Sequence, residues 1–162
     1  MILLDFENSR LDEIKKLISQ IANLKNRLKE LGIVKNGGKI TSDYSKWFCS
    51  VKFGLELCDK NELGYDAISK FEKRILIKSI VGSDIDFKTN IDEIQVDKFD
   101  SLLLVFMNEE TWMIDSIYQV SHDIVIKFLS NDRDKKFEWR RESRSLSLQL
   151  YPDEESTFSP IF

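Results

Sequence analysis

Two charged side chains within apolar runs are the best candidates for chemistry in this sequence. Asp66 lies in the run 64–68 and Lys78 lies in the run 74–79. The polar segment 69–73 between them predicts a β-hairpin that places the two runs side by side. A carboxylate and an ammonium group are costly to bury unless they pair or bind an ion. The two residues therefore predict either the core of a metal-dependent phosphodiesterase site or a structural ion pair.

Four motifs in the sequence follow the order of a known nuclease pattern. They are Ser42-Asp43-Tyr44-Ser45-Lys46-Trp47-Phe48, Gly54-Leu55-Glu56-Leu57, Gly64-Tyr65-Asp66-Ala67 and Leu76-Ile77-Lys78. By the order and spacing of these elements, the chain resembles the PD-(D/E)xK nuclease superfamily, the fold of many restriction endonucleases. Within that superfamily it is most similar to an uncharacterised group of bacterial proteins. The resemblance implies a restriction-endonuclease-like α/β fold, in which helices flank a mixed central sheet and a long helix comes first.

The resemblance also implies a role for each residue that matches the motif. Asp66 would be the central metal ligand, the backbone carbonyl of Ile77 would add a second oxygen, and Lys78 would orient or activate a water molecule. Mg²⁺ prefers oxygen ligands and retains waters, so few protein carboxylates suffice to hold it. Any activity would then be that of a Mg²⁺-dependent endodeoxyribonuclease.

Two positions depart from the family pattern. Lys46 stands where the family has a helix glutamate, and Leu76 stands where it has a polar residue two before the lysine. Leu76 cannot bind a metal, whereas Lys46 would oppose a cation and could pair with Asp66. An ion pair of Asp66 with Lys78 or Lys46 is therefore the alternative to a metal site.

Other carboxylates are candidates to replace the missing ligand. Glu56 lies on the strand before the hairpin, between two leucines. Asp43 on the second helix is the other candidate. Asp84 and Asp86, after the lysine strand, could reach a second metal, and an exposed acidic loop is the alternative for them. For Glu56 the competing interpretation is an outward-facing strand residue, because alternate strand side chains point to opposite faces.

A basic segment near the C-terminus is the candidate nucleic-acid contact. Its cations Lys136, Arg140, Arg141 and Arg144 interleave with two aromatic residues. Cations can hold a phosphate backbone, and aromatic rings can stack on bases. Acidic residues lie among them, so a salt-bridged surface strand fits the same pattern.

Composition limits the class of protein. The 162 residues carry a net charge of −4, which argues against strong non-specific nucleic-acid binding by the whole molecule. The two cysteines, Cys49 and Cys58, have no metal-site spacing and indicate free thiols in a reducing compartment. The first residues lack the features of a signal peptide, and no run approaches the length of a membrane span. These features predict a cytoplasmic protein without a membrane partner.

The N-terminal region predicts one long helix. Ser9 and Asp12 form a helix-start signal, and Gly32 ends the pattern. The apolar residues between them follow helical spacing close to a heptad: Leu11, Ile14, Leu17, Ile18, Ile21, Leu24, Leu28 and Leu31. The stripe predicts either packing onto the same domain or a homodimer formed through this helix.

The rest of the chain predicts a single nuclease-like core. We expect residues 1–39 to be the N-terminal helix and connector, 40–150 the core and 151–162 a tail. The expected order of elements is α-α-β-β-β-β-β-α-β, with connections at 82–98 and 131–136 and a last strand over 146–150.

The sequence therefore supports three functional hypotheses. The first is a divergent nuclease-fold protein that acts on DNA, in bacterial defence or DNA processing, with Mg²⁺-dependent hydrolysis weak or lost. The second is a non-catalytic module that binds DNA or a protein. The third is a dimeric scaffold assembled through the N-terminal helix.

Overall fold

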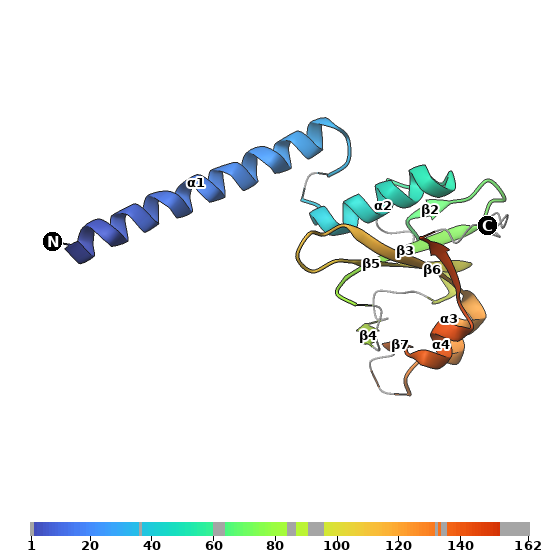
Figure 1. The fold of residues 1–162 in the computed structure, drawn as a ribbon. Helices are drawn as coiled ribbons and strands as arrows, with labels where there is room; N and C mark the ends of the chain where they lie inside the picture. Colours follow the sequence, from blue (N-terminus) through green and yellow to red (C-terminus); the bar gives the residue numbers. More distant parts are fainter. Residues whose placement is uncertain are drawn as a thin grey trace. The chain divides into compact units, whose positions relative to one another are not determined.

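The computed structural model describes residues 2–35, 37–59, 64–83, 87–90, 96–131, 133 and 136–152. The chain divides into two compact units, Met1–Tyr44 and Ser45–Phe162, and each is described by itself. Figure 1 shows a long helix in the first unit and a sheet with flanking helices in the second. The α/β class expected from the sequence is confirmed.

Helix α1, Ile2–Glu30, is the main element of the first unit. It begins before the expected start at Ser9, because residues 2–8 contain neither glycine nor proline to break it. At its other end the Gly32 N–H donates to the carbonyl of Lys29 at 2.9 Å, and Gly32 adopts a φ of 74°. Glycine accepts this left-handed conformation without strain, so the predicted end of the helix is confirmed.

Helix α2, Ile40–Phe53, crosses the boundary between the units and ends at Gly54, as its sequence predicts. From Ser45 onward it belongs to the second unit. The side chains of Ser45 and Cys49 are fully buried, and the Ser45 hydroxyl lies 3.4 Å from the sulfur of Met107 on strand β5, Ser101–Met107. This half of α2 therefore packs on the sheet, above it in Figure 1.

The central sheet has six strands in the order β1-β2-β3-β5-β6-β8. Strands β3 and β5 are parallel, and every other neighbouring pair is antiparallel, so the sheet is mixed as expected. The strands are β1 Glu56–Leu57, β2 Ala67–Ile68, β3 Arg74–Val81, β5 Ser101–Met107, β6 Ile114–Ser121 and β8 Leu148–Tyr151. The predicted hairpin is present as β2 and β3, although β2 is shorter than the run that suggested it.

The core lies mainly on the sheet face opposite α2. Helices α3, His122–Lys127, and α4, Arg141–Ser145, lie on that side (Figure 1). Strands β4, Phe87–Asn90, and β7, Lys136–Trp139, lie there as well. The buried cluster combines sheet residues with aromatic residues of the second layer: Leu76, Phe99, Leu102, Leu104, Phe106, Tyr118, Val120, Val125, Phe128, Phe137 and Trp139. Strand β5 is buried at every position, as its unbroken apolar sequence predicts for a central strand.

The sequence does not predict a second sheet. Strands β4, Phe87–Asn90, and β7, Lys136–Trp139, pair antiparallel to form one. Strand β4 lies in the segment 82–98, which is predicted as a connection, whereas β7 lies in the basic segment, for which a surface strand is one of the two interpretations. Helix α4 follows β7 in the same basic segment and is not predicted. The two paired strands are four residues each and far apart in the sequence, so local periodicity carries little information about them.

No helix in the described part of the chain has both the length and the apolar character needed to span a membrane.

Candidate functional site

The backbone at Asp66 is held between two neighbouring strands. Its N–H donates to the carbonyl of Ile75 at 2.8 Å, and its carbonyl accepts the N–H of Cys58 at 2.9 Å. The residue directly precedes β2, at the point where regular pairing with β3 ends. Beyond this point no β2 residue pairs with β3, and the Asp66 side chain lies at that edge of β3 instead.

The Asp66 carboxylate contacts two groups of opposite kind. Its Oδ2 accepts the backbone N–H of Ile77 at 2.8 Å. Its Oδ1 lies 2.8 Å from the ammonium nitrogen of Lys46. The Asp66 side chain is 18% exposed and that of Lys46 is 26% exposed, so the ion pair is largely shielded from solvent. A charge-assisted contact of this length is strong relative to a neutral hydrogen bond.

The position of Lys46 follows from the packing of α2. Its neighbour Ser45 is fully buried against the sheet, as is Cys49 one turn later. Lys46 therefore lies at the margin of the buried face, where its flexible stem reaches Asp66. The structure brings together the ion pair that the sequence offered as the alternative to a metal site.

The three positions of the Leu76-Ile77-Lys78 motif have different environments. Leu76 is 6% exposed and belongs to the core cluster. Strand alternation places the half-buried Lys78 on the same face as Leu76, opposite the face that α2 covers. The N–H and carbonyl of one extended residue point to the same edge, so the Ile77 carbonyl faces the edge at which Asp66 lies.

The candidate replacement carboxylates differ in their placement. Glu56 is exposed on the edge strand β1, where it pairs with Ile68. Asp43 accepts the backbone N–H of Lys35 at 3.0 Å within the first unit. Asp84 and Asp86 lie outside the described residues. Within the described ranges, no three His, Cys, Asp or Glu side chains form a group that could hold a metal ion.

The described residues around Asp66 do not fit a Mg²⁺ site. Mg²⁺ takes oxygen ligands in near-octahedral geometry. At Asp66 one carboxylate oxygen faces the ammonium group of Lys46, which would repel a divalent cation at that position. The position two residues before Lys78 is occupied by the apolar side chain of Leu76.

The basic segment is partly neutralised by its own acidic residues. Arg140 lies 3.5 Å from Glu138 and 3.5 Å from Glu142, and its guanidinium stacks over the ring of Phe128. The guanidinium of Arg144 lies over the Trp139 ring, 5.9 Å from its centroid.

The other two cations of this segment differ in exposure. Arg141 is exposed on α4, whereas Lys136 is half-buried at the start of β7. The structure therefore favours the salt-bridged interpretation for Arg140 and leaves Arg141 accessible on the surface.

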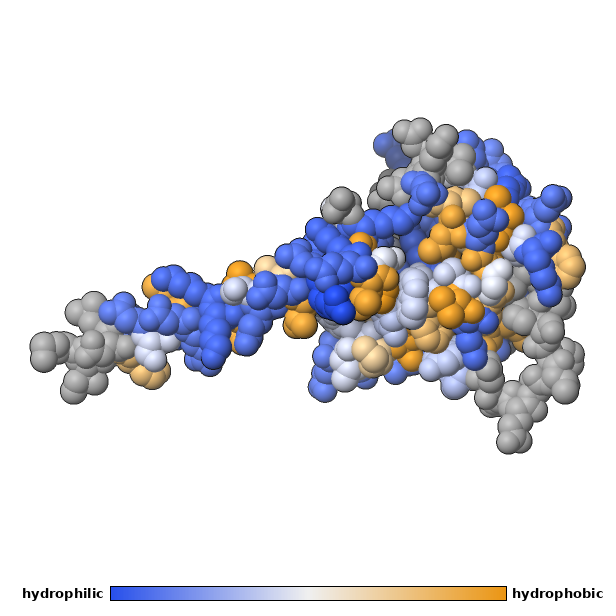
Figure 2. Space-filling view, turned by 90° about the horizontal axis from the view of Figure 1, so that it is seen from above, coloured by the Kyte–Doolittle hydropathy of each residue, from blue (hydrophilic) through white to orange (hydrophobic). Residues whose placement is uncertain are grey.

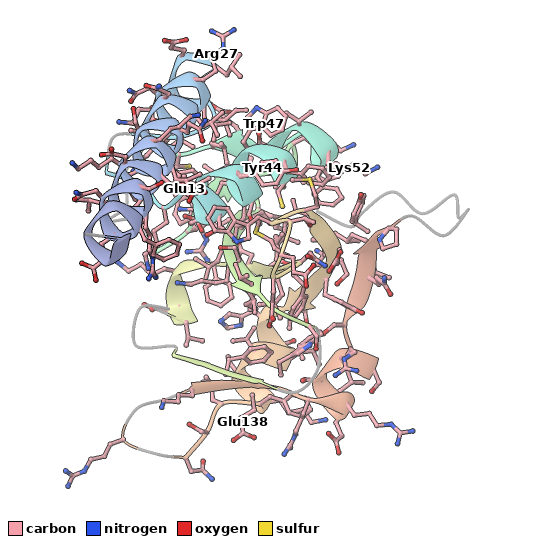
Figure 3. All side chains as sticks on the ribbon, turned by 60° about the vertical axis from the view of Figure 1, so that its left-hand side comes forward. Glu13, Arg27, Tyr44, Trp47, Lys52 and Glu138 are labelled. Carbon is pink, nitrogen blue, oxygen red and sulfur yellow. The ribbon has the colours of Figure 1, made fainter. Side chains whose placement is uncertain are left out.

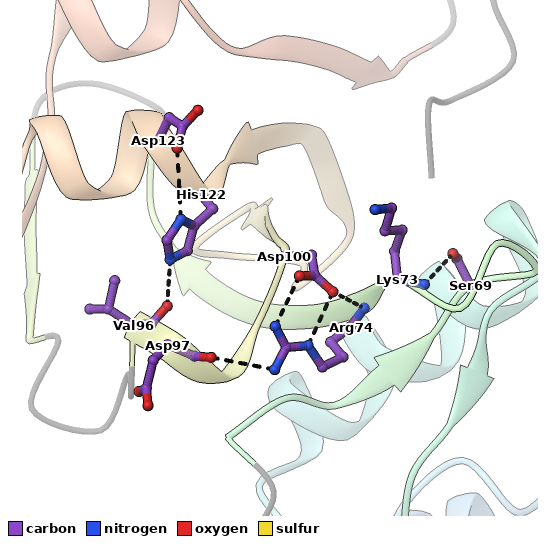
Figure 4. A network of polar contacts seen from close by, with 8 residues as sticks. All are labelled: Ser69, Lys73, Arg74, Val96, Asp97, Asp100, His122 and Asp123. Carbon is purple, nitrogen blue, oxygen red and sulfur yellow. Dashed lines mark hydrogen bonds and ion pairs between the residues drawn. The ribbon is translucent and has the colours of Figure 1, made fainter.

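A second polar network, which the sequence did not suggest, fixes the starts of β3 and β5 (Figure 4). Arg74 donates from Nε and Nη2 to the two carboxylate oxygens of Asp100, at 3.1 and 2.9 Å. The backbone N–H of Arg74 also donates to the Asp100 carboxylate at 2.8 Å, and the backbone N–H of Asp100 donates to the Arg74 carbonyl at 2.8 Å. The hydrogen bonds from Arg74 lower the pKa of Asp100 to about 2. The sequence did contain a signal for this pair. Arg74 begins the apolar run of β3, and Asp100 directly precedes the apolar run of β5.

Comparison of the sequence with protein-family models gives no match, and comparison with curated proteins gives no significant match.

Proposed function

We propose that this chain is a DNA-directed protein of the restriction-endonuclease-like type in which Mg²⁺-dependent hydrolysis is lost. The observation that carries the proposal is the ion pair of Lys46 with Asp66. In the pattern that the sequence resembles, the aspartate holds a divalent cation. Here the ammonium group of Lys46 supplies the positive charge at the same carboxylate.

The hydrogen bonding of Asp66 supports a structural role for its carboxylate. The Ile77 N–H has no partner strand residue opposite it in the β2–β3 register, which covers only Ala67 and Ile68. Asp66 Oδ2 satisfies that donor. An unsatisfied backbone N–H at a half-buried edge would cost free energy, so the carboxylate contributes to the fold without any metal.

The experiment compares cleavage and metal binding in matched variants of the full chain. Lys46→Glu restores a carboxylate at the helix position, and Lys46→Met removes the ammonium group while keeping a long apolar stem. We expect the wild type to leave plasmid and branched DNA intact in Mg²⁺ or Mn²⁺. We also expect Lys46→Glu to bind Mn²⁺ more tightly than the wild type, in a calorimetric titration.

Two results would overturn the loss of catalysis. The first is cleavage by the wild type that disappears in Asp66→Ala. The second is Mn²⁺ binding to the wild type that disappears in the same variant. Asp66→Ala with Lys46→Glu is the matched control, since any Mn²⁺ site created by Glu at 46 requires the Asp66 carboxylate.

The DNA part of the proposal has a separate test. Phosphate contacts release counterions, so DNA affinity should fall as salt rises, and Arg141→Ala should reduce both the affinity and the salt slope. Arg141 is the appropriate variant because it is exposed and lies on α4 next to the aromatic residues of the segment. DNA binding that is absent at low salt would remove the proposed substrate class.

A further inference from the structure

The apolar stripe of α1 is exposed along much of the helix. Its exposed members range from Ile14 at 46% to Leu24 at 66%: Leu11, Ile14, Leu17, Ile18, Ile21 and Leu24, with Leu31 just after the helix. Figure 2 shows apolar surface, in orange, among the hydrophilic surface, in blue, along the long helix. Single exposed apolar residues are normal on protein surfaces, but a continuous stripe marks an interaction surface.

The stripe has the spacing of a coiled-coil seam. With Ile14 at heptad position a, the a and d positions are Ile14, Leu17, Ile21, Leu24, Leu28 and Leu31. Ile14 and Ile21 lie at a, and Leu17 and Leu24 lie at d, so a partner helix of similar apolar character can cover the seam. The chain itself carries such a helix.

The charges on α1 are separated along its length. Residues 2–15 contain four acidic and two basic residues, and residues 16–30 contain one acidic and four basic residues. In an antiparallel pair the acidic half of each helix lies beside the basic half of the other. The two helix dipoles also point in opposite directions in that arrangement, which is favourable for their interaction. We propose that α1 pairs antiparallel with α1 of a second copy of this chain.

One register satisfies both the apolar and the charged positions. With the two-fold axis near residue 19, each Ile14 meets Leu24 of the other copy and each Leu17 meets Ile21. In an antiparallel coil, g positions face g positions, so Glu13 of one copy faces Arg27 of the other. Both side chains are exposed on α1, from which they project two heptads apart (Figure 3).

The parallel arrangement lacks this complementarity. Glu7 and Arg10 occupy the next a and d positions toward the N-terminus. In a parallel pair each would face the same residue of the other copy. Like charges at facing positions are destabilising. In the antiparallel register the same positions lie opposite Leu31 and Leu28, which the aliphatic stem of Arg10 can cover.

The existing ion pair of Arg27 does not prevent this contact. Arg27 bonds Glu30 of its own helix at 2.7 Å, but both side chains are more than 60% exposed (67% and 63%). Exposed pairs of this kind contribute little and exchange readily. Arg27 can therefore turn to Glu13 of the second copy when the helices associate.

A charge-swap series in the full chain tests the proposal by analytical ultracentrifugation. We expect a dimer for the wild type. By the two-fold symmetry each single substitution replaces two attractive contacts with two like-charge contacts, so Glu13→Arg and Arg27→Glu should each raise the dimer dissociation constant about tenfold. The double variant Glu13→Arg with Arg27→Glu should recover the wild-type dissociation constant. Lys29→Glu, at a position outside the seam, is the matched control and should leave the dissociation constant unchanged.

Cross-linking determines the orientation in the same protein. In a background with Cys49→Ala and Cys58→Ser, an Ile14→Cys chain is mixed with a size-tagged Leu24→Cys chain and oxidised. The antiparallel register predicts a disulfide between the two chains of different size. Disulfides only between identical Ile14→Cys chains would show a parallel pair and overturn the proposal. A monomeric wild type, as expected if α1 packs on its own domain, would overturn it as well.

Discussion

The ammonium nitrogen of Lys46 lies 2.8 Å from Oδ1 of Asp66, while Oδ2 of the same carboxylate accepts the backbone N–H of Ile77. The two contacts join α2, the segment before β2 and strand β3. They also neutralise a carboxylate that is only 18% exposed. An uncompensated charge at this depth would be costly, so the lysine has a physical reason to be there.

Removing either partner of the Lys46–Asp66 pair should destabilise the second unit. Because the pair is mostly buried, we expect Lys46→Met and Asp66→Asn each to lower the free energy of unfolding by about 1–3 kcal/mol. The double variant should lose less than the sum, since its two neutral side chains leave no unpaired charge. Urea denaturation of the four proteins measures the coupling. Additive losses would show that the pair makes no net contribution.

The Arg74–Asp100 pair predicts a loss of stability in acid. The pKa of Asp100 is lowered to about 2 in the folded protein, from an ordinary value of 3.8. Its contribution is therefore present above pH 3.8 and is lost as the pH falls through about 2. Both side chains are more than a third exposed (40% and 34%), so solvent screens the pair and the contribution is held to about 1 kcal/mol.

Asp100→Asn tests this dependence. Its free energy of unfolding should be lower than that of the wild type at pH 6, and the difference should shrink between pH 4 and pH 2, about the range the two pKa values define. Arg74→Lys keeps the charge but not the two-point contact, and should show an intermediate effect. A difference that stays constant with pH would contradict the assignment.

Two glycines with positive φ should respond unequally to alanine. Gly64 has a φ of 73°, and a Cβ there would lie 2.7 Å from the Cβ of Lys98. Gly54 has a φ of 66°, with no atom within 4 Å of its would-be Cβ. We expect Gly54→Ala to cost about 1 kcal/mol through backbone strain alone. Gly64→Ala should cost more, since Lys98 must move, and equal losses in thermal or urea unfolding would contradict the close approach.

The two thiols should differ sharply in reactivity. Cys49 is fully buried, and burial raises the pKa of its thiol to about 12. Only the thiolate is reactive, so Cys49 should resist a thiol reagent at pH 8 until the protein unfolds. Cys58 is half-buried and should react in the folded protein. Counting reactive thiols in Cys58→Ser, with and without denaturant, measures the prediction. Fast labelling of folded Cys58→Ser would contradict the packing of α2.

The elements that the sequence predicts well are those with strong local patterns. Strand β5 is a continuous apolar run, α1 has a long helical stripe, and α2 ends at a glycine with positive φ. The β4–β7 sheet has no such pattern, because its pairing joins segments far apart in the sequence (Phe87 with Trp139). Its stability comes from tertiary contacts of Phe137 and Trp139, which are fully buried.

The candidate site shows the same limit. Asp66 and Lys78 stand out in the sequence because they interrupt apolar runs, and Lys46 was identified as a residue that could pair with Asp66. The sequence could not show that Lys46 lies beside Asp66. That contact depends on the face of the sheet that α2 covers, which is set by the burial of Ser45 and Cys49. The placement of a helix on one face of a sheet is not encoded in local spacing.

The most direct test of the proposed loss of catalysis is to locate Mn²⁺ by anomalous scattering in soaked crystals of the wild type and of Lys46→Glu. We expect no Mn²⁺ peak at Asp66 in the wild type, with the Lys46 nitrogen retained beside Oδ1. In Lys46→Glu we expect a peak between the two carboxylates. A Mn²⁺ ion bound to Asp66 in the wild type, with Lys46 displaced, would contradict the proposed loss.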